Sequence, residues 1–160
     1  PEHPTTHTDA MRGQIAMLSW SRRNLGIIAT ESGADWTIPY VDIVNSSGGG
    51  SKAILVPLYN LVYHDAVIVS FGARDEKTLL QGLLFGGVPE MPIDQAAVSE
   101  KTRTLMRQMC ALHKRVGMLE MTRHEFLGNN YRKERTTFAD GTTVTVDWDS
   151  SSYKIEPDLK

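Results

Sequence analysis

Residues 25–36, with the sequence LGIIATESGADW, are the stretch on which the interpretation of the whole chain depends. The apolar run 25–29 is typical of a strand that is buried on both faces. It leads directly into a polar, acidic and aromatic segment, 30–36. Because the carboxyl ends of the strands carry the chemistry in α/β barrels, Glu31 is the first candidate for a catalytic residue. The alternative is that Glu31 and Asp35 are ordinary loop acids or helix caps.

Length and composition indicate a globular protein with a substantial core. The chain has 160 residues, of which 41% are hydrophobic and 22% are charged, and its net charge is -2. No basic excess indicates a nucleic-acid partner, and no apolar run approaches the length of a membrane span. The single Cys110 cannot form an intrachain disulfide, so cysteine usage indicates no compartment. Since the chain opens with PEHPTTHTDA and lacks an initiator Met, we expect a piece of a longer protein.

Helical and strand-like patterns alternate through the first part of the chain. Residues 8–23 have the apolar spacing of a helix, and a helix that feeds the buried run 25–29 makes one αβ unit. The Gly- and Ser-rich residues 45–51 indicate an exposed loop, which lacks the Gly-Lys-Ser/Thr ending of a phosphate-binding loop. The apolar, β-branched and aromatic region 53–71 predicts a strand that runs into the pair His64-Asp65.

Two more helices are predicted in the middle of the chain. Residues 77–85 have leucines at helical spacing, and Gly86 ends that helix. The proline-bounded segment 88–93 could form one more inner strand. The clearest helix is predicted over 94–121, because its apolar residues recur at alternating steps of four and three. The basic residues on its other faces are interpreted as a solvated outer surface.

The pattern changes after the long helix. Asp140-Gly141, flanked by alternating Thr and Val, predicts a β-hairpin over 134–148. We therefore expect an α/β domain over 1–127 and a β-rich domain over 128–160. Counted backward from the last long helix, the first domain is the closing part of a (β/α)8 barrel, and the second is the start of an antiparallel β-sandwich.

Five segments occur in order along residues 10–155: ESGADWTIPYVD, VPLYNLVYHDAVI, LLQGLLFGGVPEMP, LEMTRHEFL and RTTFADGTTVTVDW. Together they resemble the endo-α-N-acetylgalactosaminidase-like glycoside hydrolases and their uncharacterised relatives. The resemblance implies a retaining α-glycosidase barrel followed by a β-rich domain, a carbohydrate substrate, and a secreted or cell-surface location. It also implies that the nucleophilic Asp and the other barrel strands lie upstream, so we expect this part to be incomplete and inactive alone.

Glycoside hydrolysis needs two carboxyl groups, about 5–5.5 Å apart in retaining enzymes and about 6.5–9.5 Å apart in inverting ones. Glu31 and Asp65 are the only acids that directly follow strong apolar runs, and neighbouring strands lie about 4.8 Å apart. Our hypothesis is that Glu31 is the acid/base and that Asp65 is a sugar-hydroxyl ligand or the second carboxylate. In the resembled group a His-Asp pair on the seventh strand commonly holds sugar hydroxyls, and His64-Asp65 match that pair by residue type.

The other candidates are substrate-binding residues. His64 could bond a sugar hydroxyl or be a satisfied core histidine. Trp36 and Tyr63 could stack on a sugar ring, or pack between the barrel and its loops. Asp35 and Arg74 complete the set, although Arg74 could instead pair with a neighbouring carboxylate. With no His-Glu-x-x-His and no paired Cys, we expect neither a metal nor another cofactor. The alternative function is a non-catalytic carbohydrate-binding or structural α/β domain.

Overall fold

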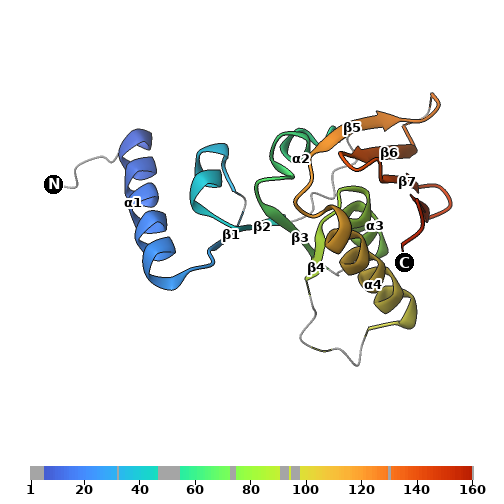
Figure 1. The fold of residues 1–160 in the computed structure, drawn as a ribbon, viewed down its shortest axis with the longest axis horizontal. Helices are drawn as coiled ribbons and strands as arrows, with labels where there is room; N and C mark the ends of the chain where they lie inside the picture. The colour runs from blue at the N-terminus through green and yellow to red at the C-terminus, as the bar shows by residue number, and fades with distance from the viewer. Residues whose placement is uncertain are drawn as a thin grey trace.

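Two sheets organise the chain in the computed structural model. The structure describes residues 6–31, 33–46, 55–72, 75–90, 94, 98–129 and 131–159. Four parallel strands in the order β1-β2-β3-β4 form the first sheet, and four antiparallel strands in the order β5-β6-β7-β8 form the second (Figure 1). This arrangement confirms the predicted fold class, an α/β part with a parallel sheet followed by an antiparallel β part.

The elements follow one another in a simple order. The first part holds α1 (His7–Leu25), β1 (Ala29–Glu31), the 3-10 helix η1 (Asp35–Tyr40), β2 (Ile43–Ser46), α2 (Leu58–Tyr63), β3 (Ile68–Gly72), α3 (Glu76–Leu84), β4 (Val88–Glu90) and α4 (Glu100–Val116). The second part holds β5 (Met121–Phe126), β6 (Lys133–Phe138), β7 (Thr143–Asp147) and β8 (Ser152–Glu156). Among the described helices, none combines the length and the apolar character that crossing a membrane requires.

The helices begin at side-chain caps that the sequence supplies. The Thr6 hydroxyl accepts from the Asp9 amide at 3.1 Å before α1, and the Ser99 hydroxyl accepts from the Thr102 amide at 3.1 Å before α4. Both α1 and α3 lie where the apolar spacing predicts them. Helix α4 is shorter than the predicted helix, because it starts only after the Ser99 cap and stops before Gly117.

The first strand begins later than its apolar run suggests. Leu25 is still the last residue of α1, and Gly26, at φ 90°, ends that helix. Ile27 is 77% exposed, and β1 starts only at Ala29. The prediction of a strand over 25–29 that is buried on both faces is therefore wrong. The reason is that β1 is an edge strand of the described sheet, so the residues that lead into β1 have no neighbouring strand on one side.

A second prediction, the strand that runs into His64-Asp65, is also wrong. Residues 58–63 form helix α2, in which Tyr59 and Tyr63, one turn apart, pack edge to face with ring centroids at 5.2 Å. The strand of this region, β3, starts only at Ile68 and pairs with β2, a strand that the sequence analysis did not expect. The composition of the region suits either element, and the packing of the tyrosines favours the helix.

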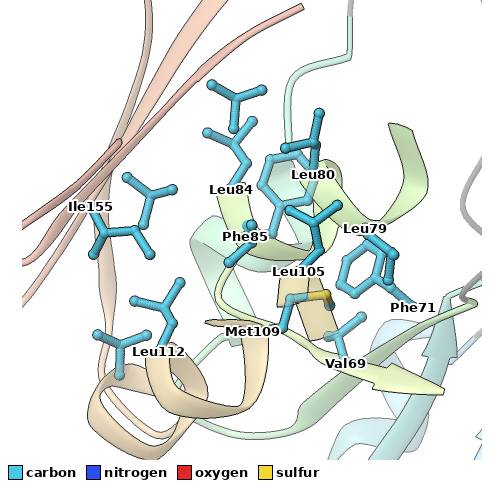
Figure 2. Close-up of a cluster of buried hydrophobic side chains, with 14 of the residues drawn as sticks. Val69, Phe71, Leu79, Leu80, Leu84, Phe85, Leu105, Met109, Leu112 and Ile155 are labelled. Atoms are coloured by element: carbon cyan, nitrogen blue, oxygen red, sulfur yellow. The ribbon is translucent and has the colours of Figure 1, made fainter. Parts of the chain in front are cut away.

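One hydrophobic cluster joins the two sheets. It contains Val69 and Phe71 from β3, the leucines of α3, and the apolar stripe of α4 (Figure 2). Phe138, Val144, Val146 and Ile155 of the antiparallel sheet belong to the same cluster. The antiparallel sheet begins at Met121, so the predicted domain boundary at 127 falls after its first strand. The helical layer thus lies between β3 and the second sheet.

Candidate functional site

A row of polar side chains crosses the parallel sheet in the carboxyl-terminal half of its strands. Glu31 of β1 pairs in register with Asn45 of β2, and Asn45 pairs with Ser70 of β3. Residues in register on neighbouring strands point to the same face, so these three side chains share one face. Glu90, at the end of β4, lies on that face as well, since the Ser70 hydroxyl donates to its Oε1 at 3.0 Å. We call these four residues the polar edge.

The face that carries the polar edge is the one that the described helices leave open. On the opposite face, Val44, Val69 and Phe71 are buried, at 4%, 6% and 2% exposed. On the open face, Ile43 and Ile68 lie toward the amino ends and are half-buried. The open face is thus apolar toward the amino ends of the strands and polar at the carboxyl ends.

Two local features position the members of the polar edge. The Asp42 carboxylate accepts from the Ile28 amide at 2.9 Å and pairs with Arg22 at 2.9 Å, which ties α1 and the start of β1 to β2. At the other side, Gly72 lies in register with Glu90 and has no side chain. Because that place is empty, the Glu90 carboxylate can lie beside Ser70.

Two other candidates, Asp35 and Trp36, follow Glu31 closely along the chain. Glu31 is exposed at the end of β1, and η1 follows it within a few residues. In η1, Trp36 is half-buried, and the exposed Asp35 accepts from the Trp36 amide at 2.9 Å. Asp35 does not cap η1, because the N-cap residue is Ala34 and no side chain makes a capping hydrogen bond there. Its bond to the next amide is that of an ordinary loop acid, and a role for Asp35 in substrate binding stays a prediction.

His64 and Asp65 lie at the opposite end of the sheet from Glu31. Since α2 replaces the expected strand, both residues precede β3 and do not follow it. Because β1, β2 and β3 run parallel, the turn before β3 lies at the amino ends of the strands, whereas Glu31 lies at the carboxyl ends. The structure therefore does not bring Asp65 and Glu31 together as tips of neighbouring strands, and this part of the hypothesis is corrected.

The His64 side chain is part of the contact between α2 and the antiparallel part. It is 4% exposed, its Nδ1 donates to the Leu119 carbonyl at 2.6 Å, and its ring lies 5.0 Å from that of Phe138. Burial lowers the pKa of His64 below its ordinary value, and the hydrogen bond to Leu119 opposes that shift in part. His64 thus occupies the core position that was the alternative to sugar binding.

Two further candidates have different outcomes. Tyr63 is half-buried and packs against Tyr59, whose pKa is raised to about 12 by burial and by the nearby Tyr63. Tyr63 and His64 both lie at the end of α2, before β3, and therefore away from the polar edge. Arg74 lies outside the described residues.

Comparison with known proteins identifies a similar solved structure. No protein-family model matches the chain, and the search of curated proteins gives no significant match. The α-N-acetylgalactosaminidase NagBb from Bifidobacterium bifidum, solved as a quadruple mutant, is 30% identical, with a TM-score of 0.83. Its complex with Gal-NHAc-DNJ is 29% identical with a TM-score of 0.82, and its GalNAc complex is 29% identical with a TM-score of 0.78.

The match extends over almost all of this chain but only part of the relative. It covers 99% of this chain and 28% of the NagBb quadruple mutant, and 97% of this chain and 29% of the Gal-NHAc-DNJ complex. The chain therefore resembles a partial region of a glycoside hydrolase. The predicted resemblance to glycoside hydrolases of this kind is confirmed at that level.

Sequence reasoning found Glu31 but missed the other members of the polar edge. Asn45 was assigned to an exposed loop, although it lies within β2. Ser70 and Glu90 were passed over inside apolar and proline-rich segments. Ser70 could have been found from the sequence, because it is the one polar residue of the apolar run 66–71. Within the described ranges, no group of three or more His, Cys, Asp and Glu side chains could hold a metal ion.

Proposed function

We propose that this chain is part of a glycoside hydrolase that cleaves α-linked N-acetylgalactosamine or a related sugar, and that the polar edge faces the substrate. The observation that carries the proposal is the position of Glu31. It ends a parallel strand on the face that the helices leave open, in register with Asn45 and Ser70. The partial match to the α-N-acetylgalactosaminidase NagBb supports this sugar class.

The proposal includes a barrel architecture. In (β/α)8 barrels, helices cover the outer face of the sheet, layers of branched side chains fill the interior, and catalytic groups lie at the carboxyl ends of the strands. The described sheet has the same distribution, with Ile43 and Ile68 below the polar edge and helices on the other face. We infer that further strands, outside these 160 residues, complete the barrel and cover the open face.

Glu31 is assigned the role of general acid/base. A proton donor at the glycosidic oxygen must be paired with a second carboxylate, at about 5–5.5 Å in a retaining enzyme. Glu90 is three strands away along the sheet, or about 14 Å at 4.8 Å per strand. A strand pairing with the free edge of β1 would lie only about 4.8 Å away. The proposal therefore places the nucleophile on such a strand, supplied from outside this chain.

The test is substitution in the full-length gene product. Glu31→Gln should lower kcat on an aryl α-N-acetylgalactosaminide by about 10²–10⁴-fold, because the amide cannot transfer the proton. Glu120→Gln is the matched control, since Glu120 is exposed and lies between α4 and β5, away from the polar edge. Near-normal turnover by Glu31→Gln would refute the assignment.

The variant Asp65→Asn tests whether Asp65 is the second carboxylate, as the sequence suggested, or a turn residue without a catalytic role. If Asp65 were the second carboxylate, its substitution would also remove activity. The structure places Asp65 in an exposed turn before β3, so we expect Asp65→Asn to retain kcat close to that of the wild type.

A second candidate is sugar binding without hydrolysis. The described part of the chain has no second acid on a strand next to β1, which favours this candidate. It predicts that the full-length gene product binds N-acetylgalactosamine, measured by calorimetry, and releases no aglycone from the aryl glycoside. Hydrolysis by the wild type would exclude it.

A further inference from the structure

Glu90 has features of a ligand-binding carboxylate that the fold itself does not require. We propose that Glu90 accepts a hydrogen bond from a hydroxyl group of the substrate sugar, and that Ser70 is the positioning residue that holds its carboxylate. This inference rests on the proposed function, because it assigns a second contact within the same site. Neither residue was a candidate from the sequence.

The Glu90 carboxylate has an unusual pairing state. Glu90 is half-buried, and its Oε1 accepts from the Ser70 hydroxyl at 3.0 Å. That neutral donor is its only partner among the described residues, and no cation pairs with it there. Within the described ranges, therefore, no ion pair of the fold accounts for the half-buried Glu90 carboxylate.

The neighbouring strand β3 preorganises the Glu90 carboxylate. Ser70 and Glu90 lie on adjacent strands, and Gly72 leaves the place opposite Glu90 free of a side chain. The Ser70 hydroxyl therefore fixes one carboxylate oxygen, and Oε2 keeps its capacity to accept hydrogen bonds. A fixed anionic acceptor suits the hydroxyl groups of a sugar ring, because hydrogen bonds to a charged group are the stronger ones.

Glu90 also has a favourable position relative to Glu31. Both side chains point to the open face at the same edge, from strands that are three apart. In a closed eight-stranded barrel such strands face each other across an interior just wide enough for side chains. Glu31 and Glu90 would then hold opposite sides of one sugar ring, with the chemistry at Glu31 and the recognition at Glu90.

The experiment combines variants with altered substrates in the full-length gene product. We expect Glu90→Ala to lower kcat/KM on the aryl α-N-acetylgalactosaminide by about 10- to 100-fold, the range for a lost hydrogen bond to a charged group. The same variant is then compared with the wild type on the 3-, 4- and 6-deoxy analogues. On the analogue that lacks the bound hydroxyl, Glu90→Ala should cause no further loss.

Ser70 supplies a matched pair for the positioning role. Ser70→Ala should raise KM with little change in kcat, and Ser70→Thr should restore KM because it keeps the hydroxyl. The melting temperature of each variant is measured, so that loss of fold is not mistaken for loss of recognition. Glu120→Gln again serves as the control.

Each outcome separates this inference from the proposed function. Equal losses on every deoxy analogue, or unchanged kcat/KM in Glu90→Ala, would overturn the role of Glu90. A collapse of kcat in Glu90→Ala that azide restores would overturn it too, by making Glu90 a catalytic carboxylate. If Glu31→Gln abolishes turnover while Glu90→Ala does not alter it, only this inference fails. Absence of hydrolysis in the wild type, or normal turnover in Glu31→Gln, is instead failure of the proposed function.

Discussion

Replacement of Gly86 should destabilise the fold for two separate reasons. It adopts φ 67° in the turn between α3 and β4, a conformation that is unfavourable for any residue with a Cβ. A Cβ there would lie 2.7 Å from His64 Nε2 and 2.9 Å from Phe138 Cζ. We predict that Gly86→Ala lowers the free energy of unfolding by about 2–4 kcal/mol, measured by urea titration at low micromolar concentration.

Gly141→Ala is the matched control for this prediction. Gly141 also has a positive φ, 84°, but a Cβ there would meet nothing within 4 Å. The backbone cost alone is about 1–2 kcal/mol. Equal losses in both variants would contradict the packing argument at Gly86.

His64 should make stability depend on pH. Burial lowers its folded pKa below the ordinary 6.5, so the unfolded chain binds the proton first as pH falls. The contribution of neutral His64 is therefore complete above pH 6.5 and is lost progressively below it, by up to about 1.4 kcal/mol per pH unit. Urea titrations between pH 7.5 and 5.5, roughly one unit either side of that value, measure the slope.

The variant His64→Phe isolates this effect. Phenylalanine does not titrate, so the variant should lose less stability than the wild type over the same pH range. Comparison of the two slopes is needed because His113 and the carboxylates are present in both proteins. Identical slopes would show that His64 does not carry the pH dependence.

At the scale of the element, the start of α3 depends on one side chain. The Asp75 carboxylate accepts from the Thr78 amide at 2.8 Å and from the Thr78 hydroxyl at 3.0 Å. We predict that Asp75→Ala lowers the free energy of unfolding by about 1 kcal/mol, and that Asp75→Ser recovers most of the loss because serine is also a good cap. A loss as large in Asp75→Ser would show that the negative charge matters more than the cap.

Helix α2 is the element where local pattern misled the prediction. A six-residue segment rich in aromatic and β-branched side chains suits a strand as well as a buried helix. The choice depended on Tyr59 and His64, which are partly or wholly buried against elements far away in sequence. Because this segment is a helix, His64 and Asp65 lie at the amino ends of the strands, and not at the carboxyl ends where the sequence predicted them.

At the scale of the molecule, the open face and the β1 edge should make the isolated chain self-associate. Trp20, Leu25 and Ile27 are 55%, 69% and 77% exposed, and Leu25 and Ile27 lie just before β1, which is an edge strand of the described sheet. Exposed apolar side chains near a free strand edge favour association. We predict concentration-dependent oligomers of the 160-residue chain in light scattering, reduced by Ile27→Lys. A wild-type chain that stays monomeric at high concentration would contradict the inference that further strands cover this surface.

The two parts of the molecule share one hydrophobic cluster, which the sequence analysis did not anticipate when it divided the chain at 127. Phe138, Val144 and Val146 of the antiparallel sheet pack into the same cluster as the leucines of α3. Whether the parts fold as separate domains stays a prediction. The shared cluster shows why their relation cannot be read from a change of pattern along the chain.

The sequence by itself determined the fold class, the positions of α1 and α3, the hairpin of β6 and β7, and Glu31 as a strand-end acid. These features depend on caps, turns and periodicity within short segments, which are local properties. Only the tertiary structure decided that Asn45, Ser70 and Glu90 share an edge and a face with Glu31, and that Asp65 does not. Strand register and the choice between helix and strand at 58–63 depend on contacts between segments distant in sequence, which no local pattern contains.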